Sequence, residues 1–93
     1  MKNEEEKTEA PAQKKVFDII VNTRPKTWDK KEISFREVVL LAFPSAVFDE
    51  KHIYTVTYSK GVDNKPKGSM VEGGEPVHVK DGMVFDVEHN DIS

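Results

Sequence analysis

One short amphipathic helix constrains the fold of this chain more than any other feature of its sequence. Ser34 and Glu37 have the spacing of a capping box, in which each side chain accepts a hydrogen bond from the backbone N–H of the other residue. Apolar side chains then recur at the i, i+3, i+4 and i+7 positions of a single buried face: Phe35, Val38, Val39 and Ala42. Because Pro44 disfavours continuation, the sequence predicts one helix of about nine residues that ends near Ala42 or Phe43.

Much of the remaining chain alternates apolar and polar residues in the manner of β-strands. Such runs, bounded by turn-forming residues, predict strands at residues 16–21, 27–33, 52–58, 69–71, 77–79 and 83–87. Pro25 places residues 22–26 in a loop, so that the first two strands form a hairpin. Asp81 and Gly82 predict either a hairpin or a sharp turn between the last two strands.

A single helix has to bury its apolar face against one side of the sheet that these strands form. The expected fold class is therefore α+β, with a mixed sheet of about four or five strands and one helix across one face. That arrangement is the β-grasp, the architecture of ubiquitin and of small sulfur-carrier proteins. The alternation assigns these side chains to the face that packs against the helix: Phe17, Ile19, Val21, Tyr54, Val56, Tyr58, Met83, Phe85 and Val87.

Only part of the chain is expected to belong to this folded unit. Residues 1–15 contain four Glu and four Lys, and Met1 supplies their one apolar side chain larger than that of Ala. Such a segment cannot bury enough surface to offset its chain entropy, so we expect a disordered arm. Residues 16–88 then form the β-grasp domain. Residues 89–93 form an exposed C-terminal tail, because they are too few and too polar to add an element.

Composition excludes several classes of function. The chain has no Cys, which excludes a disulfide framework, a thiolate zinc site and a Cys nucleophile. The spacing of His52, His78 and His89 matches no metal-ligand pattern, so neither a metal nor a cofactor is expected. A net charge of -3 with interspersed signs argues against nucleic-acid binding. No apolar run approaches the roughly 20 residues of a membrane span, so we expect a soluble, cytoplasmic protein.

Three stretches of the chain resemble the bacterial multiubiquitin-domain family. They are VNTRPKTWDKKEISFREVVLLAFP, YTVTYSKG and GEPVHVKDGMVFDV, which begin at Val21, Tyr54 and Gly74. The similarity extends over about residues 16–93, which is the whole predicted folded part with its tail. Members of this family are ubiquitin-like modules that occur singly or in tandem, and this chain has one copy without an internal repeat.

The resemblance implies that the protein is a modifier and not an enzyme. Ubiquitin-like modifiers are activated at their C-terminal carboxylate as an adenylate and then transferred to a target protein. The family is encoded beside proteins that resemble an activating enzyme, a conjugating enzyme and a processing or deconjugating metallopeptidase, so these three and the target are the expected partners. Some of these bacterial conjugation pathways are tied to antiphage defence. No catalytic constellation stands out in the sequence itself, since capping explains the hydroxyl of Ser34.

The C-terminal sequence departs from those of ubiquitin and the sulfur carriers. Those proteins end in Gly-Gly, which lets the tail enter a narrow adenylation cleft, whereas no Gly follows Gly82 here. The same absence argues against a sulfur carrier. By analogy with those proteins, the reactive position is expected near His89 or Asn90. Our hypothesis is that a peptidase removes the segment that starts at Asp91 and leaves Asn90 as the reactive terminus. Simple fraying of the chain end is the alternative.

The sheet face opposite the helix is the second candidate site. Ubiquitin-like proteins dock partners on this face, and exposed apolar clusters commonly mark interaction sites. The residues expected to bind a partner there are Val16, Ile20, Thr55, Thr57, Val84 and Asp86, with Ile53 beside them. The alternative function is therefore a non-conjugated β-grasp adaptor that binds partners through its outer sheet face. Incidental surface apolarity would explain the same residues without any function.

Overall fold

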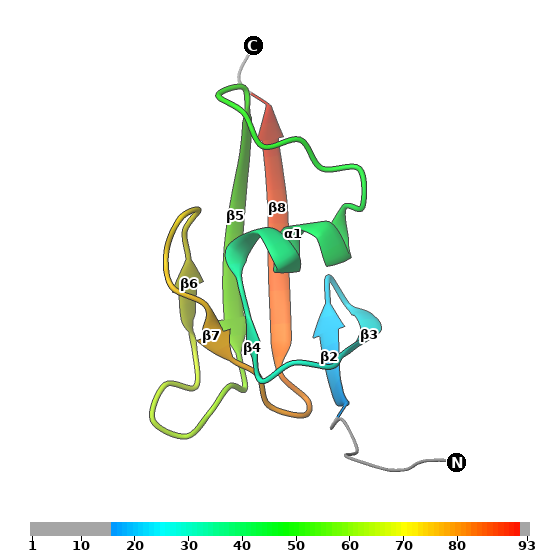
Figure 1. Ribbon diagram of the computed structural model, residues 1–93, viewed down its shortest axis with the longest axis vertical. Coiled ribbons are helices and arrows are strands. Elements are labelled where there is room, and N and C mark those ends of the chain that lie inside the picture. Colours follow the sequence, from blue (N-terminus) through cyan, green and yellow to red (C-terminus); the bar gives the residue numbers. More distant parts are fainter. Residues whose placement is uncertain (1–15, 92–93) are drawn as a thin grey trace, which may run out of the picture.

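The computed structural model describes residues 16–91, which form one helix and two sheets (Figure 1). In chain order the elements are β2 (Phe17–Val21), β3 (Arg24–Trp28), β4 (Glu32–Ile33), α1 (Phe35–Ala42), β5 (His52–Ser59), β6 (Gly68–Met70), β7 (Val77–His78) and β8 (Val84–Asp91). The arm predicted at residues 1–15 lies outside the described residues, as do residues 92–93.

The larger sheet has five strands in the order β3–β2–β8–β5–β6. β2 and β8 run parallel, whereas the other neighbouring pairs are antiparallel, so the sheet is mixed. α1 crosses one face of this sheet, and β4 and β7 form a separate two-stranded sheet (Figure 1). This arrangement confirms the predicted α+β, β-grasp architecture.

The core lies between α1 and the larger sheet, where the predicted alternation holds. Phe35, Val38 and Val39 of α1 are buried in one cluster with the helix-facing strand residues. Of the strand residues expected to face the helix, Tyr54 is half-buried. The others are buried: Phe17, Ile19, Val21, Val56, Tyr58, Met83, Phe85 and Val87. Each large apolar side chain removed from water contributes about 1.5–3 kcal/mol, so burial fixes which face of each strand meets the helix.

The capping box at the start of α1 is formed as predicted. The N–H of Ser34 donates to Oε1 of Glu37 at 2.9 Å, and the N–H of Glu37 donates to Oγ of Ser34 at 3.2 Å. Partial burial raises the pKa of Glu37, but the hydrogen bonds with Ser34 and the charge of Lys30 outweigh burial and hold that pKa below its ordinary value. This contribution to stability is therefore present above the unfolded-state pKa and is lost as the pH falls through the lower folded-state pKa.

The first hairpin differs from the prediction in its turn. The loop expected at residues 22–26 is a two-residue turn of Asn22 and Thr23, whose φ angles are 52° and 67°. β3 begins directly after this turn and pairs with β2. Pro25 is tolerated inside β3 because this strand lies at the edge of the sheet, where a missing N–H loses no bond to a further strand.

The strand predicted at residues 27–33 is two separate strands in different sheets. β3 ends at Trp28, and β4 pairs with β7. Residues 77–79 therefore do not form a hairpin with the last strand. The turn before β8 is instead a sharp bend, with φ of 85° at Gly82, that leads β8 into parallel pairing with β2. Both pairings join segments far apart in the sequence. Local alternation of apolar and polar residues indicates a strand but does not indicate which distant strand it pairs with.

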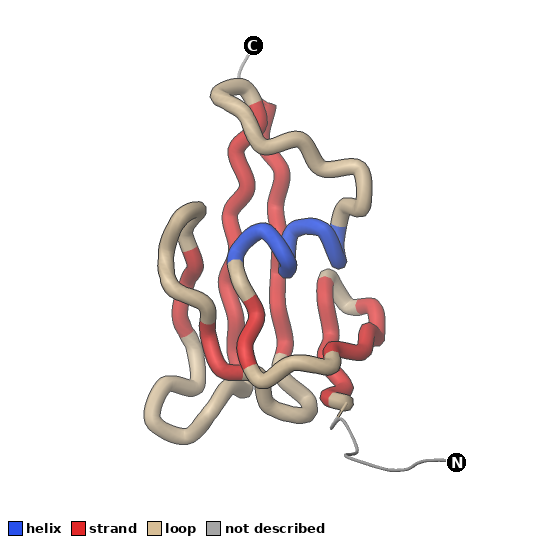
Figure 2. Tube along the Cα trace, in the orientation of Figure 1, coloured by secondary structure: helices blue, strands red, loops and turns tan. Residues whose placement is uncertain are grey.

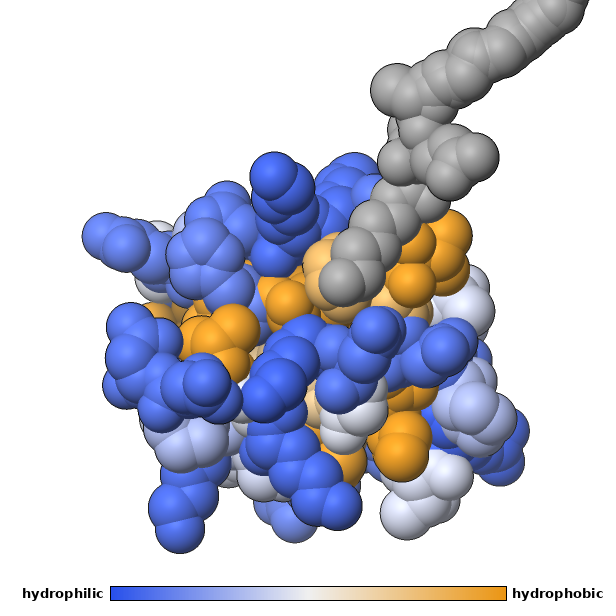
Figure 3. Space-filling model, turned by 90° about the horizontal axis from the view of Figure 1, so that it is seen from below, coloured by the Kyte–Doolittle hydropathy of each residue, from blue (hydrophilic) through white to orange (hydrophobic). Residues whose placement is uncertain are grey.

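The end of the domain opposite the tip of β8 is largely hydrophilic. Figure 3 shows this end from below, with small apolar areas separated by hydrophilic side chains. Charged residues of its loops pair with one another, as Nζ of Lys80 lies 3.3 Å from Oδ1 of Asp63. A solvated surface of this kind needs no functional explanation.

Candidate functional site at the tip of β8

β8 continues beyond Val87, where the last strand was predicted to end. It runs to Asp91 and pairs with β5 over that whole length. The facing residues at its end are Tyr54 and His89, Ile53 and Asn90, and His52 and Asp91. The boundary expected between a domain ending at residue 88 and an exposed tail therefore falls inside a strand. A strand forms from this polar sequence because β5 supplies partners for its backbone groups.

Of the strands that residues 16–91 form, only β5 and β8 extend to this end of the larger sheet. β2 pairs with β8 no further than Phe85, and β6 pairs with β5 only from Val56 to Tyr58. Residues 52–55 and 88–91 thus form a two-stranded extension, here called the ribbon tip, that projects from the body (Figure 1). A two-stranded ribbon has little stability of its own, so its side-chain contacts matter.

Aromatic rings gather on the helix side of the ribbon tip. His89 stacks on Tyr54, with ring centroids 4.8 Å apart, and on His52, with centroids 5.4 Å apart and ring planes only 6° from parallel. Phe43 lies 6.1 Å from His89, and Phe48 lies 5.6 Å from Tyr54, again between ring centroids. These five side chains are called the aromatic cluster below: Phe43, Phe48, His52, Tyr54 and His89.

The loop between α1 and β5 lies against the aromatic cluster. This loop runs from the end of the helix to the outer end of the ribbon tip (Figure 2). The N–H of Val47 donates to the hydroxyl of Tyr54 at 3.2 Å. The guanidinium of Arg36 on α1 lies 4.6 Å from the ring centroid of Phe48 and also pairs with Glu72. The cluster is therefore linked to the helix as well as to both strands of the ribbon.

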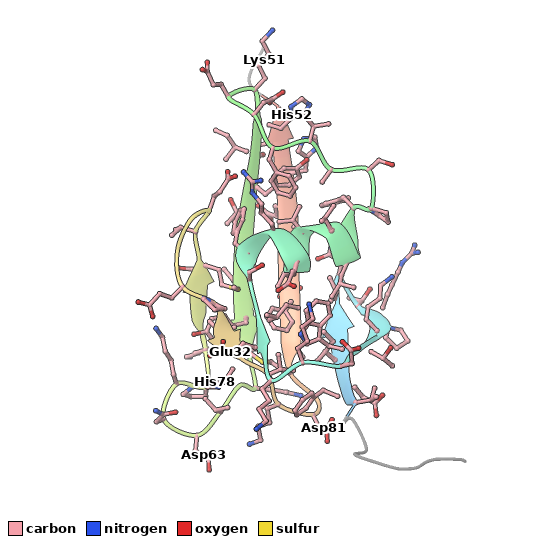
Figure 4. All side chains as sticks on the ribbon, viewed as in Figure 1. Glu32, Lys51, His52, Asp63, His78 and Asp81 are labelled. Carbon is pink, nitrogen blue, oxygen red and sulfur yellow. The ribbon has the colours of Figure 1, made fainter. Side chains whose placement is uncertain are left out.

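Asp49 in this loop fixes the start of β5. Its Oδ1 accepts the N–H groups of Lys51 at 2.9 Å and of His52 at 3.1 Å, and it lies 2.6 Å from Nδ1 of the His52 ring. The hydrogen bond with that ring is the main cause that holds the pKa of Asp49 below its ordinary value. Lys51 and His52 lie together at the outer end of the ribbon tip (Figure 4). The carboxylate thereby orients the ring that stacks on His89.

Asn22 secures β8 just before the ribbon tip. Its N–H donates to the carbonyl of Phe85 at 2.9 Å. Its side chain accepts the N–H of Val87 at 2.7 Å and donates through Nδ2 to the carbonyl of Val87 at 3.1 Å. The side-chain amide therefore makes the two hydrogen bonds to Val87 that the backbone of a neighbouring strand would make. β2 ends here without leaving these two groups unsatisfied.

A profile of the multiubiquitin family matches residues 17–91, which extend from the first residue of β2 to the last residue of β8. The chain belongs to the multiubiquitin family. It is therefore a ubiquitin-like protein, in agreement with its β-grasp architecture. No curated protein sequence and no solved structure matches the chain significantly.

The multiubiquitin domain gives the three predicted reactive-end residues different surroundings. His89 belongs to the aromatic cluster, Asn90 lies opposite Ile53, and Asp91 is the last residue of β8. Phe43 and Phe48 also belong to this site, although the sequence did not predict their contribution. The available signal was the presence of two large aromatic side chains in and around a Pro-containing loop, where such residues need a packing partner.

The outer face of the multiubiquitin domain brings most of the predicted docking residues side by side. The register places Ile20 beside Val84, Thr57 opposite Asp86, and Thr55 opposite Glu88. Ile20 is 37% exposed, and Val16, just before β2, is 51% exposed. Asp18, Asp86 and Glu88 are exposed as well, so acidic groups accompany the apolar pair. The predicted surface is thus contiguous on β2, β8 and β5, with Val16 at its margin.

The remaining histidine lies elsewhere. His78 is on the small sheet, with Nε2 at 3.8 Å from Oε2 of Glu32, and the two labelled histidines are at opposite ends of the domain (Figure 4). Within residues 16–91, no group of three or more His, Asp or Glu side chains is placed to hold a metal ion. The part of the chain that the structure describes also contains no helix long and apolar enough to cross a membrane.

Proposed function

We propose that this ubiquitin-like protein is a modifier whose C-terminal carboxylate is joined to a target protein. The observation that carries the proposal is the position of the end of β8, which leaves the body of a multiubiquitin domain and presents residues 88–91 at its tip (Figure 1). Within residues 84–90 of β8, the buried side chains extend no further than Val87. An enzyme can therefore act on the tip while the core stays folded.

The proposed reaction sequence uses the protein as a substrate at every step. A metallopeptidase hydrolyses the bond between Asn90 and Asp91. An activating enzyme then joins the Asn90 carboxylate to the α-phosphate of ATP and releases pyrophosphate. A nucleophile of the conjugating enzyme displaces AMP, and a nucleophile of the target finally takes the acyl group. The protein supplies the electrophile and no catalytic side chain, in a bacterial cytoplasmic pathway of the kind tied to antiphage defence.

A covalent adduct is expected when the protein is incubated with its activating enzyme, conjugating enzyme, metallopeptidase, target and ATP. Mass spectrometry of the linked peptide should show a modifier that ends at Asn90, and omission of ATP should abolish the adduct. A linked form that ends at Ser93, or at any residue other than Asn90, would show that the processing site is wrong. Failure of active enzymes to form any adduct would contradict the modifier function.

The outer sheet face supports a second candidate function, that of a non-conjugated adaptor. Ile20 and Val84 lie side by side there. Replacing both with Asp is expected to weaken binding of the activating enzyme at least about ten-fold, as for a central apolar pair of an interface, without unfolding the domain. Circular dichroism checks the fold, and isothermal titration calorimetry measures the affinity.

The matched control for this pair is Leu40→Asp. Leu40 is 42% exposed, close to the value for Ile20, but it belongs to α1 on the other side of the sheet. The adaptor would be favoured over the modifier by three results together: the double variant loses affinity for the activating enzyme, the control keeps it, and no covalent adduct forms with the wild-type protein. Unchanged affinity in the folded double variant would exclude this face.

A further inference from the structure

The bond that must be cut in the proposed function lies inside a paired strand. The N–H of Ile20 donates to the carbonyl of Met83, and that of Asn22 donates to the carbonyl of Phe85, so these carbonyls face β2. Backbone groups of alternate residues point to opposite edges of a strand, and the carbonyl of Asn90 therefore faces β5, where Ile53 lies opposite. A peptidase has to bring its metal and water to this same carbonyl. In the closed ribbon tip, β5 occupies that edge.

Side-chain stacking holds the ribbon tip closed. Among the strands of residues 16–91, β2 and β6 do not reach this part of the sheet, and residues 88–91 pair here with β5. His89, the neighbour of the bond to be cut, stacks on its cross-strand partner Tyr54 and on His52. Asp49 holds the His52 ring through Nδ1. Cross-strand aromatic pairs of this kind stabilise a ribbon whose backbone alone is marginal.

We propose that His89 and Tyr54 are positioning residues that keep the Asn90–Asp91 bond in the closed ribbon tip, so that processing proceeds only from an opened ribbon. This inference rests on the proposed function. Opening separates residues 88–91 from residues 52–55. Cleavage is then a simple hydrolysis: the water oxygen bonds to the carbonyl carbon of Asn90, the C–N bond to Asp91 breaks, and the released nitrogen takes a proton.

The opened segment has a defined lower boundary. The side chain of Asn22 forms hydrogen bonds with both the N–H and the carbonyl of Val87. The side chains of Phe85 and Val87 are buried in the core. Opening is therefore limited to residues that follow Val87. The part of β8 that packs in the core stays in place, while the part that contains the Asn90–Asp91 bond separates from β5. The aromatic cluster controls only the released part.

Amide hydrogen exchange followed by NMR tests this role in three variants. His89→Ala is expected to accelerate exchange of the Asn90 amide about three- to ten-fold, the factor that corresponds to loss of an aromatic pair. The amides of Val56 and Phe85 should exchange at the wild-type rate, because the core stays closed. His89→Tyr keeps a ring and should restore slow exchange. Glu88→Ala is the matched control, since Glu88 is an exposed neighbour on β8 outside the cluster.

Carboxypeptidase Y gives a second measurement that needs none of the pathway enzymes. Release of Asp91, which requires hydrolysis of the Asn90–Asp91 bond and is followed by mass spectrometry, should be faster in His89→Ala by the same factor as exchange, and unchanged in Glu88→Ala. Unchanged exchange and release in His89→Ala would overturn the inference, and so would equal acceleration in the Glu88 control. The adduct experiment tests the proposed function separately, because it depends on the pathway enzymes and these two measurements do not.

Discussion

Phe85→Ala is expected to lower the free energy of unfolding by about 3–5 kcal/mol, the usual range for removal of a buried Phe. Phe85 has no exposed surface and lies on β8, between β2 and β5 in the centre of the sheet. Its ring packs near that of Tyr58, with centroids 6.2 Å apart. A domain of this size has a total stability of about 5–10 kcal/mol, so the variant loses a large share of it.

Urea unfolding followed by the fluorescence of Trp28, the only Trp of the chain, measures this loss. Val84→Ala is the control, because Val84 is the neighbouring residue on β8 but faces away from the helix and is only half-buried. Its truncation should remove about 1 kcal/mol or less. Equal losses in the two variants would show that the helix side of β8 is not the core.

Asn22→Ala is expected to lower the free energy of unfolding by about 2–4 kcal/mol. The change removes both side-chain bonds to Val87 and leaves a part-buried N–H and carbonyl without these partners, which costs about 1–3 kcal/mol. It also places an Ala at a φ of 52°, which adds about 1 kcal/mol for a residue with a Cβ and no stabilising side-chain bond.

Asn22→Gly separates these two contributions, because Gly adopts a positive φ freely but has no side-chain amide. The Gly variant should be about 1 kcal/mol more stable than the Ala variant and still less stable than the wild type. Urea unfolding of the three proteins under the same conditions gives the comparison. A Gly variant as stable as the wild type would show that the bonds to Val87 contribute nothing.

The fold was predictable wherever local pattern decides structure. The capping box of Ser34 and Glu37 and the spacing of Phe35, Val38 and Val39 predicted α1 because both signals lie within one segment. Alternation likewise assigned the buried side chains of β2, β5 and β8 to one face. Which strands pair with one another was harder to predict from the sequence. Whether Pro25 lies in a loop or in a strand depends on its place at the sheet edge, which the local sequence does not contain.

The candidate site shows the same division between local and long-range information. The sequence predicts that His89, Asn90 and Asp91 belong to an exposed tail, because their polarity alone indicates no strand. Their pairing with residues 52–54 depends on the register between β5 and β8, which the buried side chains lower in the sheet determine. The bonds between Asn22 and Val87 join still more distant parts of the chain, and no motif around either residue predicts them.

The central place of β8 in the sheet also has a consequence for synthesis of the protein. Within the larger sheet, β2 and β3 connect to β5 and β6 only through β8. A chain emerging from the ribosome makes its N-terminal hairpin early, but that hairpin cannot join the rest of the sheet until the last strand of the domain has been translated. Such high contact order slows folding and prolongs exposure of the nascent chain to chaperones and proteases. A chain that stops before β8 lacks the strand that joins the two halves of the larger sheet, so we expect such a chain not to fold.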